Sequence, residues 1–283
     1  MIKHIFLFLV SSFLFISCSR HNINEKKDWQ RFFTEEGIDS ATFEVFDNTH
    51  DQVYILNIPR ASTPYSPAST FKIFNSLVAL ETNVAPDINY IIKWDGVKRS
   101  RDAWNKDMDM KEAFEVSCVP YYQELARKIG KDTLKHYMDS CNYGNKKIGD
   151  KVDEFWLNDT LKISPDEQLG FVKKMYFDKL PFSMRAQRLV RSMMLHEAND
   201  NYKLYYKTGT SQSDKCYTAW LLGYIEKIEI QKNIETKKME TNFRPYFFVM
   251  HFDTKDTSQE SRKLLDKRVS IAKKVFKDLS IIK

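Results

Sequence analysis

Cysteine and histidine are few in this chain of 283 residues, and neither forms a metal-binding pattern. The six histidines show no H-x-x-x-H pair or comparable ligand spacing, so a metal-dependent mechanism has no support. Of the four cysteines, Cys18 falls at the end of an N-terminal apolar segment, which leaves Cys118, Cys141 and Cys216. An odd number of cysteines at wide spacing implies no disulfide framework. We therefore expect no metal and no disulfide.

Clusters of one charge sign, internal repeats and low-complexity tracts are also missing. The formal charge of +6 arises from lysines spread along the whole length, with acidic residues between them. Dispersed charge is typical of a solvated surface, so we expect no nucleic-acid partner. Glycine is scarce, with eight residues, and we connect this with no function. What the chain does have is 42% hydrophobic and 14% aromatic residues, enough for a globular protein with a sizeable core.

An apolar run near the N-terminus, residues 5–16, is too short to span a bilayer comfortably. Because this apolar run comes directly after basic residues, we predict that residues 1–18 are an export signal and that the mature chain works in the periplasm. Cys18 resembles the lipidated cysteine of bacterial lipoproteins, although Phe15 stands where such signals usually carry leucine. Lipidation, which would anchor the chain to a membrane, and simple cleavage both remain open. Residues 19–30 would form a polar tether.

Strand patterns occur toward both ends of the chain, and helical patterns fill the middle. Strands are expected at residues 42–46, 53–58, 202–206, 218–225 and 246–252. The last of these is apolar at every position except His251, which favours a central strand buried on both faces. The polar segment 226–244 is expected to form an extended hairpin arm, and residues 264–279 a closing amphipathic helix.

This order predicts a single domain over residues 31–283. We expect an α/β fold of the α+β type, in which a central antiparallel sheet is made from both chain ends and flanked by helices. Residues 31–85 and 201–283 would form the mixed part. Residues 86–200 would form the inserted helical part, including a helix that is capped by Ser164 and closed by Pro181.

Ser69 and Lys72 lie three residues apart at the start of an apolar helical segment. Positions i and i+3 share one face of a helix, so the hydroxyl and the amine can approach each other. A serine becomes a useful nucleophile only when a neighbour accepts its proton, and a lysine can do so only when burial favours its neutral form. Alone, S-x-x-K is also explained by a chance surface pair.

The segment Lys207-Thr208-Gly209 follows the strand expected at residues 202–206. By itself it could be a lysine-bearing turn whose glycine lets the backbone approach a ligand. S-x-x-K together with K-T-G is the motif pair of penicillin-recognising serine enzymes, and both occur here in that order.

Further segments complete the pattern. They are Glu115-Val116-Ser117-Cys118-Val119-Pro120, Tyr143-Gly144-Asn145 and Trp220-Leu221-Leu222-Gly223-Tyr224, together with Ser66 to Lys72 and the K-T-G segment. From about Phe43 to its C-terminus the chain closely resembles the class D serine β-lactamases, the oxacillinases. The resemblance implies the serine β-lactamase and penicillin-binding transpeptidase-like fold, β-lactam hydrolysis and antibiotic resistance.

In the family, the lysine that matches Lys72 is carboxylated by CO₂ and serves as the general base. The resemblance therefore implies that Ser69 forms the acyl-enzyme and that Lys72 is an N-carboxylysine, with no cofactor beyond reversibly bound CO₂. It also implies that the indole N–H of Trp156 holds the carbamate. Without the resemblance, Trp156 is explained as a core aromatic.

The remaining roles also rest on the resemblance. Ser117 would pass a proton to the leaving ring nitrogen, although it is also explained as a helix cap, and Lys207 would add positive potential. The backbone N–H groups of Ser69 and Thr210 would form an oxyanion hole. Arg268 would bind the substrate carboxylate, with Arg262 as its rival. The substrate-binding set is Val119, Thr208, Gly209, Thr210 and Arg268.

Two other functions stay open: a penicillin-binding or β-lactam-sensor domain that acylates without turnover, and a non-catalytic lipoprotein with the same fold. The full set of predicted site residues favours the enzyme. The sequence leaves open the range of β-lactams, the role of the 226–244 arm, and whether the protein is a monomer or a homodimer.

Overall fold

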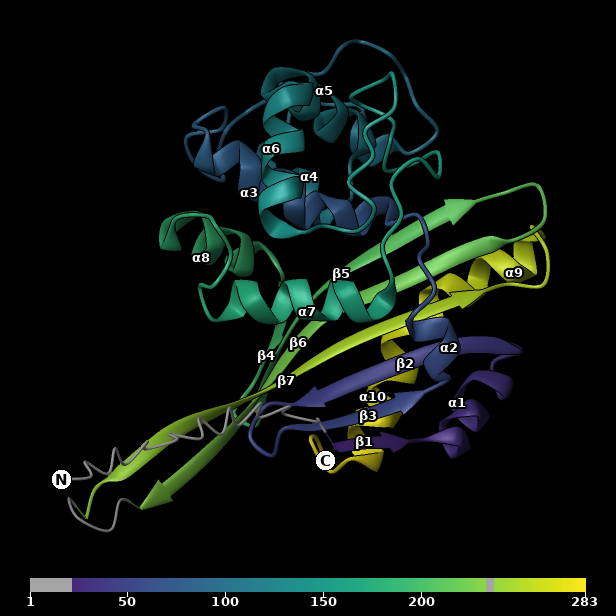
Figure 1. Cartoon of the computed structure of the whole chain (residues 1–283), viewed down its shortest axis with the longest axis vertical. Coiled ribbons are helices and arrows are strands. Elements are labelled where there is room, and N and C mark those ends of the chain that lie inside the picture. The colour runs from purple at the N-terminus through teal and green to yellow at the C-terminus, as the bar shows by residue number, and fades with distance from the viewer. Residues whose placement is uncertain (1–21, 233–236) are drawn as a thin grey trace, which may run out of the picture.

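The computed structural model describes residues 22–232 and 237–283. Its centre is one seven-stranded sheet with the order β1-β3-β2-β7-β6-β5-β4 (Figure 1). The strands are β1 (Asn22–Glu25), β2 (Ser40–Asp47), β3 (Gln52–Leu56), β4 (Leu195–Ala198), β5 (Tyr202–Gln212), β6 (Tyr217–Lys232) and β7 (Met239–Asp253). All neighbouring pairs are antiparallel except β1 with β3. Because β2 pairs with β7, the sheet joins both ends of the chain, which confirms the predicted fold class.

Ten α-helices lie within the described residues, joined by short 3₁₀ turns. The helices are α1 (Gln30–Thr34), α2 (Ile58–Ala61), α3 (Phe71–Glu81), α4 (Met110–Glu115), α5 (Val119–Ile129), α6 (Lys131–Cys141), α7 (Pro165–Tyr176), α8 (Met184–Met193), α9 (Gln259–Leu264) and α10 (Arg268–Asp278). The 3₁₀ turns are η1 (Lys27–Trp29), η2 (Ala68–Thr70), η3 (Asp102–Trp104) and η4 (Leu265–Lys267). Of the helices in the described part, none is long and apolar enough to cross a bilayer.

The apolar run in β7 is explained by a sheet that is covered on both faces. Phe247 and Val249 belong to the core cluster under α7 and the helical region, whereas Phe248, Met250 and Phe252 belong to the cluster under α1 and α10. Side chains of a strand alternate between faces, so a strand with a core on each side is apolar at nearly every position. The predicted central strand is confirmed (Figure 1).

The predicted tether at residues 19–30 is wrong for its described part. β1 pairs with β3, and Trp29 is fully buried and donates an indole hydrogen bond of 3.0 Å to Asp278. An edge strand is held by backbone hydrogen bonds to its neighbour, so the polar side chains of β1 give no indication that these residues form a strand. The folded domain therefore begins by Asn22. The predicted export signal, residues 1–18 with Cys18, lies outside the described residues.

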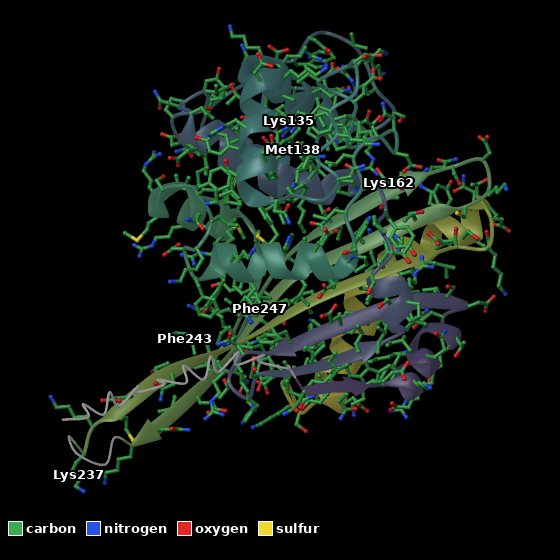
Figure 2. The ribbon with its side chains drawn as sticks, in the orientation of Figure 1. Lys135, Met138, Lys162, Lys237, Phe243 and Phe247 are labelled. Carbon is green, nitrogen blue, oxygen red and sulfur yellow. The ribbon has the colours of Figure 1, made fainter. Side chains whose placement is uncertain are left out.

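The predicted arm is confirmed, and it projects away from the rest of the sheet. β5 stops pairing with β6 at Lys227, and from there β6 and β7 continue as a two-stranded ribbon in which Ile228 pairs with Phe243 and Lys232 with Met239. Figure 2 shows Phe243 on this ribbon and Phe247 where β7 enters the body. The K-T-G segment lies in the other direction along β5, so the arm does not border that segment.

Two helix boundaries differ from the sequence expectation. The Ser164 cap and its reciprocal bond with Glu167 are present, but α7 ends at Tyr176, before Pro181. The closing helix begins as the tighter turn η4 and becomes α-helical only at Arg268. Arg268 therefore sits in the first turn of α10, where its side chain reaches back to the sheet.

Candidate active site

Ser69 and Lys72 meet where the turn η2 passes into helix α3. Lys72 Nζ lies 2.9 Å from Ser69 Oγ, although Ser69 precedes the α-helix that the sequence predicted for it. In a 3₁₀ turn, residues three apart lie one above the other, so the pair still meets. Lys72 is fully buried, and this burial lowers its pKa to about 7, with the charge of Arg101 acting in the same direction. The neutral amine is therefore well populated at neutral pH.

The backbone just before Ser69 is held in an unfavourable conformation. Ala68 has φ of +48°, in the left-handed region that residues with a Cβ avoid. Its N–H donates to the carbonyl of Trp156 at 3.1 Å, and Ser66 Oγ donates to the same carbonyl at 3.0 Å. Strain of this kind persists only where the surroundings fix it, and it is common at active sites. These two bonds tie the Ser69 turn to the segment that carries Trp156.

Trp156 is a buried side chain with an unused donor. Its ring stacks on Phe71 with centroids 5.0 Å apart, so it packs as the core aromatic expected without the family resemblance. Within the described residues its Nε1 has no hydrogen-bond partner. A buried donor without a partner is costly and is rare in native structures. The indole N–H is therefore available to a further acceptor, and its ring stacks on Phe71, the residue that precedes Lys72.

Trp156 is kept in place by the Tyr143-Gly144-Asn145 segment. A Cβ at Gly144 would lie 2.2 Å from the carbonyl oxygen of Lys162, so only glycine fits there. Asn145 Nδ2 donates to the carbonyl of Thr160 at 3.0 Å. These contacts fix the segment that follows Trp156, in keeping with an architectural role for this motif.

Ser117 and Lys207 form the second polar pair of the site. Lys207 Nζ donates to Ser117 Oγ and to the carbonyl of Thr208, both at 3.1 Å. Burial holds the pKa of Lys207 well below its usual value, and the charge of Lys72 adds to this effect. Ser117 has φ of +56°, and the N-cap of α5 is Cys118. The helix-cap explanation of Ser117 is therefore wrong. Val119, the first residue of α5, is half-buried.

The sequence predicted that the K-T-G segment follows a strand. In the structure the segment lies within strand β5. A Cβ at Gly209 would lie 3.0 Å from the carbonyl oxygen of Pro67 and 3.2 Å from Thr70 Cγ2. Glycine therefore lets β5 pack directly against the turn η2 that carries Ser69. This close packing brings the Thr210 end of β5 next to Ser69.

Arg268 reaches the same end of β5 from helix α10. Its Nη1 donates to the carbonyl of Gly209 at 2.8 Å, to Thr210 Oγ1 at 3.1 Å and to the carbonyl of Trp220 at 3.3 Å. Burial lowers the pKa of Arg268 to about 10. Its predicted rival Arg262 is exposed on α9, and both arginines line one cavity at this end of β5.

The structure thus pairs Ser69 with Lys72 and Ser117 with Lys207, and it places Arg268 at the Thr210 end of β5. The carbonyl of Trp156 holds the turn that precedes Ser69. Sequence reasoning missed two neighbours of the site. The ring of Tyr122 lies 5.2 Å from Lys72 Nζ, and Arg101 lines a cavity with Thr210 and Arg268. The buried position of Tyr122 on α5 could have suggested it, but Arg101 lies in an irregular stretch with no pattern.

A nucleophilic serine beside a buried lysine, with a second serine that accepts a hydrogen bond from a lysine on the sheet, defines a penicillin-recognising serine protein. Residues 36–244 match the family described as the penicillin binding protein transpeptidase domain. More narrowly, the chain is 35% identical to the β-lactamase OXA-48 of Klebsiella pneumoniae over 98% of this chain and 97% of that protein. It is 32% identical to OXA-10 of Pseudomonas aeruginosa over 92% of each chain.

Solved structures agree with these relatives. The class D β-lactamase FUS-1 of Fusobacterium nucleatum superposes with a TM-score of 0.81 at 33% identity, covering 92% of this chain and all of that one. A class D β-lactamase of Sebaldella termitidis gives a TM-score of 0.83 at 31% identity, covering 93% of this chain and all of that one. The chain belongs to the class D β-lactamases.

Proposed function

We propose that this class D β-lactamase opens the β-lactam ring through an acyl-enzyme on Ser69, with Lys72 carboxylated as the general base. The observation that carries the proposal is the 2.9 Å contact between Ser69 Oγ and a fully buried Lys72 Nζ whose pKa is lowered to about 7. Only an uncharged amine captures CO₂, and burial supplies one. Hydrolysis of β-lactam antibiotics in turn confers resistance to them.

The residues around Lys72 fit a carbamate. Trp156 Nε1 is a buried donor that has no acceptor among the described residues, and a carbamate oxygen is an acceptor. When bound, the carbamate supplies the base that accepts a proton from the Ser69 hydroxyl and later from the deacylating water. Trp156 would hold it, and the stacking on Phe71 keeps the indole ring from turning away.

Ser117 is suited to pass a proton to the leaving ring nitrogen. Its Oγ accepts a hydrogen bond from Lys207 Nζ, so its own hydroxyl hydrogen remains free to be donated. As the Ser69 oxygen bonds to the ring carbonyl carbon, the carbon–nitrogen bond breaks, and Ser117 protonates the nitrogen. Lys207 then restores the Ser117 proton.

Charge on the substrate is stabilised from β5 and α10. The backbone N–H groups of Ser69 and Thr210 form the oxyanion hole, where each donor is commonly worth about 10² to 10³ in rate. Arg268, held at Gly209 and Thr210, lies where it can bind the substrate carboxylate, with Thr208 beside it. A planar, two-pronged donor suits that group.

The proposal extends to location. The apolar run at residues 5–16 and the residues around Cys18 support export to the periplasm, with lipidation of Cys18 as a membrane anchor. Mass spectrometry of the mature N-terminus tests this part. A diacylated Cys18 supports the anchor, whereas an unmodified N-terminus beyond Cys18 supports simple cleavage.

Steady-state hydrolysis of a chromogenic β-lactam by wild type and by Ser69→Ala tests the catalytic proposal. We expect multiple turnovers by wild type and none by the variant. A single stoichiometric burst, with stably acylated Ser69 in the mass spectrum, would instead identify a penicillin-binding or sensor domain.

A further inference from the structure

A cavity of about 440 Å³ opens beside the proposed carboxylate site, where β5 faces α9 and the turn η4. Its polar lining includes Arg101, Thr210, Gln212, Arg262, Asp266 and Arg268. Arg101 comes from the irregular stretch before α4, and the other residues come from the sheet and the C-terminal helices. The cavity therefore lies between the helical part and the sheet part.

The charges around this cavity do not balance. Three guanidinium groups line it, from Arg101, Arg262 and Arg268, but only one carboxylate, that of Asp266. Throughout residues 22–232 and 237–283, neither Arg101 nor Arg262 forms an ion pair with another side chain, although most arginines of this chain do. Asp266 offsets one of these three positive charges, and one substrate carboxylate at Arg268 offsets a second, so one guanidinium charge still faces the cavity without a counter-charge.

Arg101 is placed to act on a substrate and not merely on solvent. Its guanidinium lies 4.9 Å from the ring centroid of Trp104, a contact that restricts an otherwise exposed side chain. Its charge lowers the pKa of Lys72, Lys207 and Arg268 alike. The field of this arginine therefore extends across the whole site, from the nucleophile to the carboxylate-binding end.

We infer that the cavity between Arg101 and Arg268 binds a second acidic group of the substrate, so that doubly anionic β-lactams are preferred over singly anionic ones and Arg101 selects them. The first acid is the carboxylate on the ring nucleus, at Arg268. The second is a carboxylate or sulfonate on a substituent. Arg101 is the specificity-determining residue because its guanidinium is held against Trp104 and its charge acts on both catalytic lysines, whereas Arg262 is exposed on α9 and is not among the charges that act on them. The inference rests on the proposed function.

Matched substrate pairs that differ by one acidic group test this. Benzylpenicillin and its α-carboxy analogue carbenicillin form the first pair, in which carbenicillin carries the additional charge on the acyl side chain. Cefamandole and cefonicid form the second pair, with methyl and sulfomethyl on the same tetrazole, so cefonicid carries the additional charge on the opposite substituent. We expect wild type to favour the dianion in at least one pair by kcat/KM. In Arg101→Gln, that dianion-to-monoanion ratio should fall about five- to tenfold.

Two controls separate recognition from a structural effect. Arg101→Lys keeps the charge and should retain part of the preference, and added NaCl should reduce the preference of wild type. Lys98→Gln removes a positive charge from the same exposed stretch but does not line the cavity, and its ratio should stay within about twofold of wild type. Unchanged ratios for both pairs in Arg101→Gln would overturn the inference.

Binding to Ser69→Ala by calorimetry distinguishes failure of the inference from failure of the proposed function. This variant lacks the nucleophile, so the ratio of dissociation constants for each pair reports the cavity alone. A preference for the dianion that disappears on adding Arg101→Gln supports the inference even if wild type fails to turn over. Equal affinities in Ser69→Ala, with normal turnover by wild type, overturn the inference and leave the proposed function intact.

Discussion

Lys207 Nζ lies 3.1 Å from Ser117 Oγ, and this bond joins strand β5 of the sheet to the loop before α5 in the helical part. The two residues are far apart in the chain, and each is constrained separately. Ser117 is held at φ of +56°, and Lys207 is buried beside the ring of Phe114, 5.5 Å from its centroid. The catalytic assembly therefore depends on how the two parts pack together.

Replacing Lys207 by methionine tests this bond. The change keeps most of the side-chain volume but removes the donor and the charge, so Ser117 loses the group that restores its proton. We expect the acylation rate to fall about 10²-fold, as is usual when a general acid–base partner is lost. Stopped-flow measurement of the acylation burst gives this rate. Lys203→Met, on the same strand but outside the site, is the control, and equal acylation rates in wild type and Lys207→Met would contradict the role.

The lowered pKa of Lys72, about 7, predicts how activity depends on pH. Below this value the amine becomes protonated and cannot hold CO₂, so activity falls as pH falls; above it the neutral form prevails. Added bicarbonate should restore activity lost at mildly acidic pH, because it shifts the amine toward the carbamate. The measurement is initial rate against pH, with and without bicarbonate. Rates indifferent to bicarbonate over the whole range would argue against carboxylation.

Trp156→Phe removes the unpaired indole donor but leaves an aromatic ring to stack on Phe71. We expect the acyl-enzyme on Ser69 to accumulate, because deacylation depends on the group that Trp156 holds. Trp156→Ala should show the same accumulation with a further loss of about 3–5 kcal/mol in the free energy of unfolding, from the cavity it leaves. Mass spectrometry of the quenched reaction detects the intermediate. Rapid turnover by Trp156→Phe without accumulation would refute the role.

The sequence predicted most of this site because the motif residues carry the chemistry themselves. Ser69, Lys72 and Lys207 are identified by spacing, and the apolar residues around Lys72 already indicated a buried amine. The burial of the strand 246–252 between two cores is equally visible in the sequence, since every position there except His251 is apolar.

What the sequence did not predict depends on backbone and on long-range packing. β1 is held to β3 by main-chain hydrogen bonds, and its exposed side chains show no pattern typical of a strand. The left-handed backbone at Ala68 is fixed by the carbonyl of Trp156, 88 positions away in the chain. Arg101 joins the site only because an irregular stretch folds over the end of β5. None of these contacts has a local sequence signal.

Glu44 is a buried carboxyl on β2, and burial raises its pKa to about 8, with Asp166 adding to the effect. It is therefore protonated in the folded protein but ionised above about pH 4.5 in the unfolded chain. The unfolded state binds fewer protons in this window, so the contribution of Glu44 to stability falls as pH rises from about 4.5 to about 8, by up to about 1.4 kcal/mol per pH unit.

Glu44→Gln cannot ionise and should lack this dependence. We expect its free energy of unfolding, relative to wild type, to increase steadily between pH 5 and pH 8. Urea titrations at several pH values measure the difference, in which groups common to both proteins cancel. Parallel curves for the two proteins would show that Glu44 is ionised in the fold.

Gly209→Ala tests the close approach of β5 to the nucleophile turn. The new Cβ would lie 3.0 Å from the carbonyl oxygen of Pro67, a main-chain atom that can move only if the turn carrying Ser69 moves with it. Because misplacement of about 1 Å can cost about 10²-fold in rate, we expect a loss of acylation of that order in a protein that remains folded. Gly170→Ala on α7, where an added Cβ meets nothing within 4 Å, is the matched control and should retain full activity with equal or greater stability. Wild-type acylation by Gly209→Ala, measured in the same stopped-flow assay, would show that the turn and the strand are not coupled through this contact.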